Sequence, residues 1–255
     1  MFGLHHFILI GISVLLIVLF TLYIRKKNIS LEKVLSAACV ICILSEVTKI
    51  FSTLQTVPSS DGSMMYLYLD VKQLPLHLCS IQIILIFIVR FTKNINLREK
   101  LLAFIYPTGV LGGLFAIVLP TYLNGMTPLE IFTSPRMYQY FLFHIMLVTL
   151  GIYIAASGCV RFHIRHLFSS LGILALFALG SLYLNSMFAS PVYKSGQLVS
   201  MEYMPNYFFT QEVPIHFPLT EKWHWFAWWG IMLLLAVILF SLCFLPVILR
   251  DRKRL

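Results

Sequence analysis

Charged residues are scarce in this chain. Asp, Glu, Lys and Arg make up 11% of its 255 residues, whereas a soluble domain carries about 25%. Hydrophobic residues reach 59%, and the mean hydropathy is +0.87. This composition excludes a water-soluble globular protein. It predicts an all-α polytopic membrane protein, folded as a single membrane domain over residues 1–255.

Acidic residues are scarcer than basic ones. The chain has 10 Asp and Glu against 19 Lys and Arg, which gives a net charge of +9. In a soluble protein such an excess would point to nucleic acid. In a membrane protein, cationic loops face anionic lipid on the cytoplasmic side. We therefore expect membrane lipids as partners and no nucleic acid, while composition carries no information on oligomeric state.

Several motifs are also missing. The five cysteines lie in or beside apolar segments and form no secreted-type disulfide framework. The N-terminus lacks the basic region and small-residue cleavage site of a signal peptide, so its apolar run is expected to remain as a first helix. There is no glycine-rich phosphate loop and no nucleophilic serine elbow. No cofactor is expected.

Seven segments are apolar over roughly the 20 residues that a membrane-spanning helix needs. The fourth is the least regular, because it contains Pro107, Gly109, Gly112 and Gly113. Small residues let membrane helices approach closely. A proline is tolerated inside such a helix where neighbouring helices satisfy the backbone carbonyl that it frees. The seven predicted spans are residues 3–24, 34–54, 76–92, 101–119, 137–157, 167–185 and 226–248.

Basic residues are distributed unevenly between the two sides of these spans. Fourteen fall in the loops around 25–33, 90–100 and 161–165 and in the C-terminal tail, while four fall on the opposite side. The positive-inside rule then predicts an outer N-terminus, a cytoplasmic C-terminus and a multi-pass protein of the cell membrane. The long outer loop 186–225 is a candidate lid, re-entrant segment or loop packed on the bundle.

Polar side chains inside spans are costly and mark candidate sites. Under the predicted topology they gather in the outer half of the bilayer, which suggests a polar pocket open to that side. Gln82 shares a helical face with Cys79, and the three-residue spacing of Glu46 and Lys49 allows them to pair. The clustered residues are Glu46, Lys49, His77, Cys79, His144 and Asn185.

Each of these residues also has a purely structural interpretation. A cysteine in an apolar helix is often a small hydrophobe, and a Glu–Lys pair often clamps helices together. A metal site of His77, Cys79 and His144 is disfavoured, because the spacing is unusual and a fourth ligand is missing. No metal is expected. The remaining histidines lie at ends or in loops and are expected to be solvated: His5, His6, His163, His166, His216 and His224.

The stretch "LPLHLC", in which Pro75 is expected to begin the third helix, precedes a later span with one histidine, "FLFHIMLVTLG". In these features the chain resembles the YwaF-type bacterial integral membrane proteins. These are similar to a eukaryotic multispanning family that transfers fatty acyl groups to lysophospholipids through a cysteine and a histidine. The resemblance implies that Cys79 is the nucleophile and His144 its base. The eukaryotic pattern has a histidine directly after the cysteine, whereas His77 precedes Cys79 by two.

Two functions remain open. The first is a cysteine-dependent lipid acyltransferase or acyl hydrolase, in which His144 activates the thiol, Gln82 donates to the oxyanion, and Lys49 contacts a lipid phosphate or pairs with Glu46. The second is a small-solute transporter or structural membrane protein whose polar cluster holds the bundle together. Repeated broken helices would favour transport, but only the span 101–119 looks broken. Proximity of Cys79 and His144 would favour catalysis.

Overall fold

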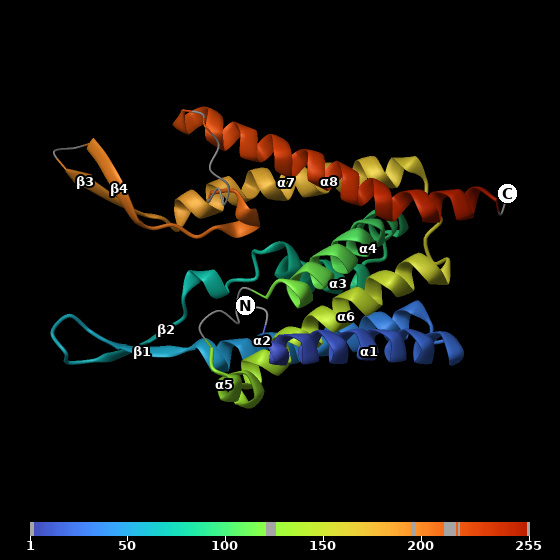
Figure 1. The fold of residues 1–255 in the computed structure, drawn as a ribbon, viewed down its shortest axis with the longest axis horizontal. Helices are drawn as coiled ribbons and strands as arrows, with labels where there is room; N and C mark the ends of the chain where they lie inside the picture. The colour runs from blue at the N-terminus through green and yellow to red at the C-terminus, as the bar shows by residue number, and fades with distance from the viewer. Residues whose placement is uncertain (1–2, 121–125, 195–196, 212–217, 219, 254–255) are drawn as a thin grey trace. The chain divides into compact units, whose positions relative to one another are not determined.

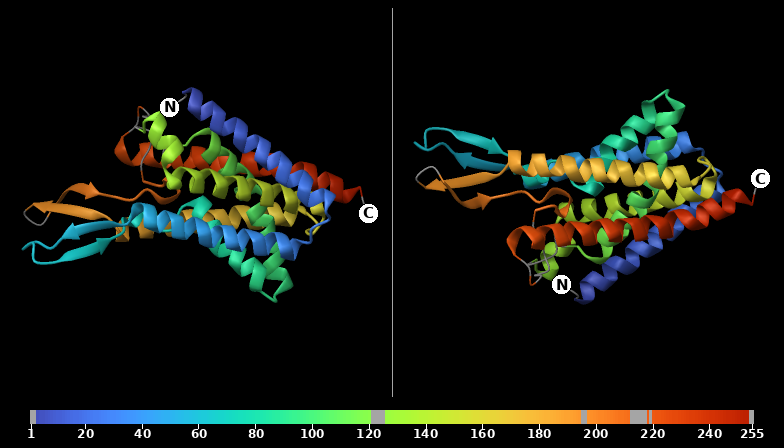
Figure 2. Two further views of the ribbon diagram at one scale, coloured as in Figure 1. Left: turned by 90° about the horizontal axis from the view of Figure 1, so that it is seen from below. Right: turned by 90° about the horizontal axis from the view of Figure 1, so that it is seen from above.

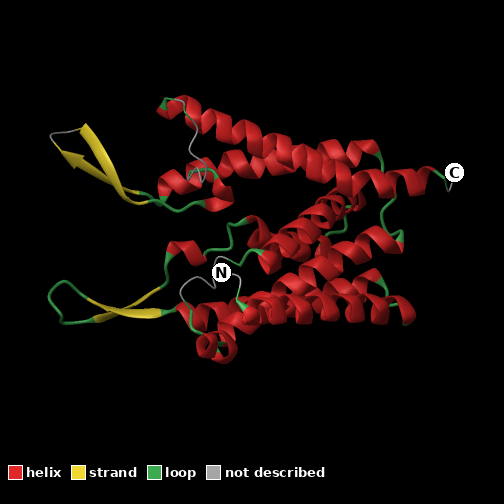
Figure 3. Ribbon diagram, in the orientation of Figure 1, coloured by secondary structure: helices red, strands yellow, loops and turns green. Residues whose placement is uncertain are grey.

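The computed structural model describes residues 3–120, 126–194, 197–211, 218 and 220–253. Helices dominate these residues (Figures 1 and 3), and six of them are long and apolar enough to cross a membrane. A further apolar helix, α3 (Leu78–Phe91), has 14 residues. The prediction of a helical, multi-pass membrane protein is confirmed at this level. Two short β-hairpins, which the sequence analysis did not predict, accompany the helices.

The chain divides into two compact units. Unit 1 comprises Met1–Pro75 and Cys79–Arg161, and unit 2 comprises Leu76–Leu78 and Phe162–Leu255. In unit 1, α6 is the central helix, since it packs against α1, α2 and α4. The long helices of unit 1 are α1 (Leu4–Lys26), α2 (Leu31–Thr53), α4 (Ile95–Val118) and α6 (Pro135–Ser157), and the short α5 is Pro128–Thr133.

The first, second, fifth and sixth predicted spans agree with helices to within a few residues. The fourth begins earlier than the predicted 101–119. Asn94 caps α4 by accepting a hydrogen bond from the Leu97 backbone N–H at 3.0 Å, as is usual for a helix N-cap. The charged first turn of α4 therefore extends the helix beyond its apolar run, and a hydropathy window excludes such residues.

The third helix begins later than predicted. Val71–Gln73 forms a 3-10 turn whose cap, Asp70, accepts a hydrogen bond from the Lys72 backbone N–H at 2.8 Å. Leu74 is extended, with φ −59° and ψ 144°, as expected of a residue before proline. Pro75 consequently lies in a turn before the helix, and the expectation that it begins the helix is wrong. Cys79 is the second residue of α3.

Close packing of α4 on α6 depends on glycine. A methyl group added to Gly109 would lie 2.9 Å from the Leu147 carbonyl oxygen, and one on Gly151 would lie 2.8 Å from that of Tyr106. Gly113 is equally close, because its added methyl would lie 3.0 Å from a backbone oxygen of α6. The close approach predicted for the glycine-rich span is therefore confirmed, and it places α6 directly against α4.

Gly151→Ala should destabilise unit 1, because the new methyl group meets backbone atoms that side-chain rotation cannot move. Overpacking of this kind costs about 1–3 kcal/mol. The thermal midpoint of the detergent-solubilised protein should fall accordingly. Gly172→Ala in α7 (Ile164–Met187) is the matched control, since nothing lies within 4 Å of its added methyl; it should stabilise the helix by up to ~1 kcal/mol. Equal shifts for both variants would contradict this account.

Unit 2 is built on α7 and α8 (Glu221–Arg252), which pack together. Between them lie a hairpin of β3 (Ser190–Lys194) and β4 (Gln197–Tyr203) and a short helix, η3 (Tyr207–Phe209). Because η3 packs on α7, this part of the long loop 186–225 is a loop packed on helices. Its residues 195–196, 212–217 and 219 lie outside the described residues. The helix α8 begins at 221, before the predicted 226, and ends at 252.

The other hairpin, β1 (Gln55–Pro58) with β2 (Met65–Tyr68), extends beyond the end of α2 in both views of Figure 2. Asp61 in its turn accepts hydrogen bonds from the Ser59 hydroxyl and from the Ser63 backbone N–H and hydroxyl. These hydrogen bonds lower the pKa of the Asp61 carboxyl to about 2. The turn therefore keeps its charge throughout the physiological pH range.

Two histidines expected to be solvated are buried instead. His6 is 1% exposed, with Nε2 3.4 Å from the Ile117 carbonyl oxygen on α4. His166 is 3% exposed, and its Nδ1 accepts the His163 backbone N–H at 3.2 Å. That expectation is therefore wrong for both residues. Each has a backbone partner for a ring nitrogen, on α4 for His6 and three residues earlier in the chain for His166, and this bond offsets part of the cost of burial. His216 lies outside the described residues.

Candidate functional site

His144 lies inside α6 and is 6% exposed. Its Nδ1 lies 2.7 Å from the backbone carbonyl oxygen of Tyr140, one turn earlier in the helix. Because a carbonyl only accepts hydrogen bonds, this contact requires the proton on Nδ1 and leaves the lone pair on Nε2. The helix itself therefore selects the imidazole tautomer that accepts a proton at Nε2.

Cys79 lies at the start of α3 as a free, half-buried thiol. A methyl group added to Gly112 would lie 3.3 Å from its Sγ, so the sulfur lies against α4. The next residue, Gly113, packs against the backbone of His144. Cys79 and His144 thus approach consecutive residues of α4 from two different helices of unit 1.

Tyr140 connects these two residues. Its ring centroid lies 4.3 Å from that of His144, and it is near enough to Cys79 for their charged forms to interact. Its hydroxyl donates to the Ala116 carbonyl on α4 at 3.0 Å. The sequence analysis did not single out Tyr140, although its four-residue spacing from His144 places both on one helical face.

Arg136 extends the same face of α6 by one further turn. Its guanidinium interacts electrostatically with Tyr140 and His144, and it repels the ammonium of Lys49 on α2. The sequence analysis counted Arg136 only as a loop charge. The repeat of four residues from 136 to 140 to 144 is the signal that would have placed it beside the histidine.

The ion pair expected from spacing is present in α2. Lys49 Nζ lies 2.6 Å from Glu46 Oε1 and 2.5 Å from Oε2, with the lysine buried and the glutamate half-buried. One turn away, the side-chain amide of Gln139 donates to the Ser45 hydroxyl at 2.5 Å. Polar side chains therefore lie where α2 packs against α6, near Arg136.

Gln82 is fully buried in α3. Its side-chain amide donates to the Thr108 hydroxyl at 2.9 Å, and that hydroxyl donates to the Phe104 carbonyl at 2.6 Å. Gln82 therefore ties α3 to α4 one turn below Cys79. This contact uses an amide proton of the group expected to face the oxyanion.

The remaining two predicted site residues, His77 and Asn185, belong to unit 2. His77 makes an edge contact with the Tyr207 ring, with centroids 5.0 Å apart. Asn185 is fully buried and accepts the Tyr207 backbone N–H at 2.9 Å. Its amide donates to the Tyr207 carbonyl at 3.2 Å and to the Thr210 hydroxyl at 2.8 Å. Within unit 2, Asn185 therefore fastens η3 to the end of α7.

Asn185→Ala should loosen this loop without unfolding the helices. The substitution removes the acceptor of the buried Tyr207 backbone N–H, at a cost of about 1–3 kcal/mol, while the Tyr207 carbonyl keeps its bond from the Thr210 hydroxyl. Hydrogen exchange should become faster over residues 206–211 and remain unchanged over α4. The neighbouring exposed Ser186→Ala is the control, because its hydroxyl donates to the Leu182 carbonyl within α7. Unchanged exchange at 206–211 would contradict the role of Asn185 as the fastening residue.

The described residues contain no group of three or more His, Cys, Asp or Glu side chains able to hold a metal ion. The arrangement in unit 1 is instead a thiol, an oriented imidazole and a tyrosine, with cations on two neighbouring helices. Chemically, such a set can abstract a proton, form a covalent bond through sulfur and pair with an anionic group.

Comparison with known proteins shows the family to which this chain belongs. No curated protein and no solved structure matches this chain. One family model does match, that of the TMEM164 family, and it covers residues 1–245. This match includes every helix of unit 1 and most of unit 2. The chain therefore belongs to the TMEM164 family, a family of multispanning membrane proteins.

Proposed function

We propose that this protein is a lipid acyltransferase that uses Cys79 as nucleophile and His144 as general base. The observation that carries the proposal is the orientation of His144, whose Nδ1 is engaged by its own helix while its Nε2 keeps the lone pair. A half-buried thiol is a weak nucleophile in an apolar setting and needs such a base to form its thiolate.

In the first half-reaction, His144 Nε2 takes the Cys79 proton and the thiolate attacks the carbonyl carbon of a phospholipid ester. The carbon–oxygen bond then breaks. The lysophospholipid leaves with the proton returned by the imidazolium, and the acyl group remains on Cys79 as a thioester. The donor lipid supplies the acyl group, so the step needs no oxidant or further co-reactant.

In the second half-reaction, the hydroxyl of an acceptor lysophospholipid gives its proton to Nε2 and attacks the thioester carbonyl. The carbon–sulfur bond breaks, and the thiol of Cys79 regains the proton from the imidazolium. Water in place of the acceptor would release a fatty acid, which is the acyl hydrolase form of the same chemistry. The half-buried position of Cys79 favours a lipid acceptor over water.

The cations near this pair support a phospholipid substrate. Lys49 on α2 pairs with Glu46, and the Arg136 guanidinium on α6 is near enough to repel the Lys49 ammonium. We assign them to the lipid phosphate, which pairs well with guanidinium and ammonium groups. Gln82 is assigned a supporting role, because its bond to Thr108 holds the α3 segment that carries Cys79. His77 and Asn185 are assigned to support of unit 2.

The same proposal includes the finer topology. We infer seven spans, with α3 crossing as a short helix, an outer N-terminus and a cytoplasmic C-terminus in the cell membrane. The basic loops support this orientation, and the resemblance of "LPLHLC" to the YwaF-type bacterial proteins is retained as part of the proposal. In this orientation the Cys79 and His144 level faces the outer leaflet.

The test is an acyl-transfer assay with the purified full-length protein in vesicles. The vesicles hold a phospholipid with an isotope-labelled acyl chain and an unlabelled lysophospholipid acceptor, and mass spectrometry follows both products. The proposal predicts that the acceptor lysophospholipid becomes a labelled diacyl phospholipid, and that this product depends on Cys79. Labelled free fatty acid without diacyl product would assign hydrolysis instead. If neither product exceeds the level in protein-free vesicles across a panel of acyl chains and headgroups, the proposal fails.

A further inference from the structure

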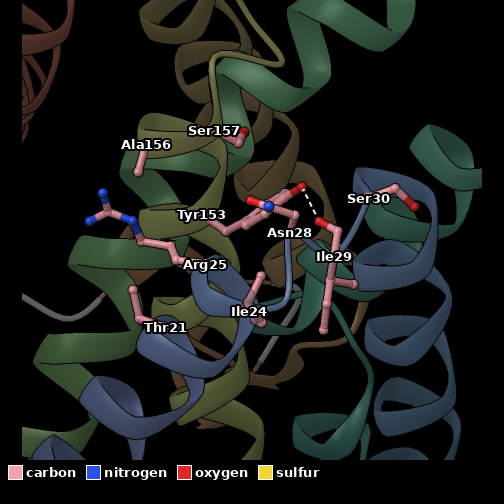
Figure 4. Close-up of a pocket in the computed structure, with 9 residues that line it drawn as sticks. All are labelled: Thr21, Ile24, Arg25, Asn28, Ile29, Ser30, Tyr153, Ala156 and Ser157. Atoms are coloured by element: carbon pink, nitrogen blue, oxygen red, sulfur yellow. Dashed lines mark hydrogen bonds between the residues drawn. The ribbon is translucent and has the colours of Figure 1, made fainter.

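A cavity lies in unit 1, at the end of its helices that is distant from His144. Its volume is about 500 Å³, and Figure 4 shows the residues that line it. Ser157 follows His144 by 13 residues along α6, a rise of about 20 Å. The cavity is therefore separate from the proposed acyl-transfer site. Its lining consists of Thr21, Ile24, Arg25, Asn28, Ile29, Ser30, Tyr153, Ala156 and Ser157.

The cavity is built by a defined turn between α1 and α2. Asn28 has φ 45°, a left-handed conformation that asparagine adopts more readily than most residues. The Ile29 backbone N–H donates to the Ile24 carbonyl at 3.1 Å, and the Ile29 carbonyl accepts the Tyr153 hydroxyl at 2.8 Å. The second of these bonds is drawn in Figure 4. The turn is thereby fixed to α6, and the cavity between them is preformed.

The polar groups of the lining suit an anion. Arg25 forms no ion pair with any described residue, and none of the nine lining residues is acidic. The Thr21 hydroxyl oxygen is buried and has no hydrogen-bond partner among the described residues. A guanidinium and an unsatisfied hydroxyl donor can together bind several oxygens of one anionic group.

The charges near the cavity are also mostly positive, which favours an anion. Lys26 and Lys27 follow Arg25 directly. Ser30 caps the N-terminus of α2 without a side-chain capping bond, so the positive end of that helix also faces the turn. The nearest acidic residue on α2, Glu32, is paired with Arg90 and Arg98 on α3 and α4. No unbalanced negative charge therefore opposes an anion here.

The position of the cavity identifies the kind of anion. On α1, in the turns before its basic end, apolar side chains such as Leu22 and Leu19 are exposed, as expected of a span that contacts lipid chains. Apolar residues of the lining, Ile24 and Ala156, continue this surface into the cavity. A basic cluster at the end of an apolar span lies at the headgroup level. We propose that the cavity binds the phosphate of a phospholipid headgroup, paired with Arg25, while the acyl chains lie along α1.

The first test compares two neighbouring cations. Purified full-length protein in detergent is titrated with phosphatidylglycerol, and bound lipid is measured by native mass spectrometry. Arg25→Gln should weaken binding by roughly tenfold, the effect of losing one charge-assisted contact. Lys26→Gln, which removes the same charge outside the lining, should change it by less than about twofold. Equal losses in the two variants would show only general cationic attraction and would overturn the site.

The second test asks whether the lipid binds in this cavity and whether the bound phosphate belongs to a lipid or to a soluble anion. Thr21→Val removes the hydroxyl at constant volume and should weaken binding several-fold. Ala156→Trp should fill the cavity and block it, whereas Ala175→Trp, on an exposed position of α7, should not. Inorganic phosphate at millimolar concentration should fail to displace the lipid. Displacement by inorganic phosphate would assign the cavity to a soluble anion, and retained binding in Ala156→Trp would place the lipid elsewhere; either result overturns the proposal.

Discussion

Cys79→Ser should reduce acyl transfer by about 10⁴-fold or more, because no acyl-enzyme forms without the thiol. A serine hydroxyl occupies nearly the same volume, but it is far harder to ionise beside an imidazole than a thiol is. The substitution should therefore leave the fold and the α3–α4 contact at Gly112 intact. The vesicle assay with labelled phospholipid measures the loss, and the thermal midpoint should stay unchanged.

Cys243→Ser is the matched control for this variant. Cys243 is also a half-buried thiol within a long apolar helix, but it lies in α8 of unit 2. It should keep full activity. The catalytic assignment would be wrong if Cys79→Ser retained transfer at the wild-type rate, or if both serine variants lost activity to the same degree.

His144→Gln should reduce transfer by about 10²–10⁴-fold, the usual contribution of a positioned general base. Glutamine fills much of the space of the imidazole, so the loss reports the missing base rather than a cavity in α6. The loss should fall on kcat, with KM for the lipid changed little, because His144 acts on the proton of Cys79. Kinetics over a range of lysophospholipid concentrations separate the two parameters.

His224→Gln provides the comparison, since His224 lies in α8 of unit 2. It should behave as wild type. A His144→Gln protein with a raised KM and an unchanged kcat would instead identify His144 as a binding residue. Tyr140, whose ring lies 4.3 Å from His144, would then be expected to contact the lipid as well.

Hydropathy predicted the long membrane helices well, because lipid imposes a simple rule on every span. Six long apolar helices agree with predicted segments. The start of α3 was predicted two residues too early. There the local backbone decides, through the 3-10 turn capped by Asp70 and the extended Leu74 before Pro75. A hydropathy pattern contains no information on such a turn.

The candidate site was predictable only in part. Cys79 and His144 stood out as polar residues in apolar surroundings, and Glu46 with Lys49 stood out by spacing. Tyr140 and Arg136 were missed, although each lies four residues from the next along the face that ends at His144. Contacts between helices, such as that of Gln82 with Thr108, depend on packing angle and register, which no single helix specifies.

The cavity at the end of α1 shows the same limit. Its residues come from the end of α1, the following turn and the last turns of α6, which are far apart in the sequence. In the count of loop charges, Arg25 is one of fourteen basic residues on the same side. Its separate role emerged from the bond between Tyr153 and Ile29, which joins the two segments.

The central claim is that His144 activates the Cys79 thiol, and site-resolved thiol labelling tests it most directly. Intact membranes are treated with a limiting amount of a membrane-permeant thiol probe, and mass spectrometry quantifies each of the five cysteines in wild type and in His144→Gln. The account predicts that Cys79 is labelled fastest in wild type and falls to the rate of Cys243 in the variant. Labelling of Cys79 at the same rate with and without the imidazole would contradict it.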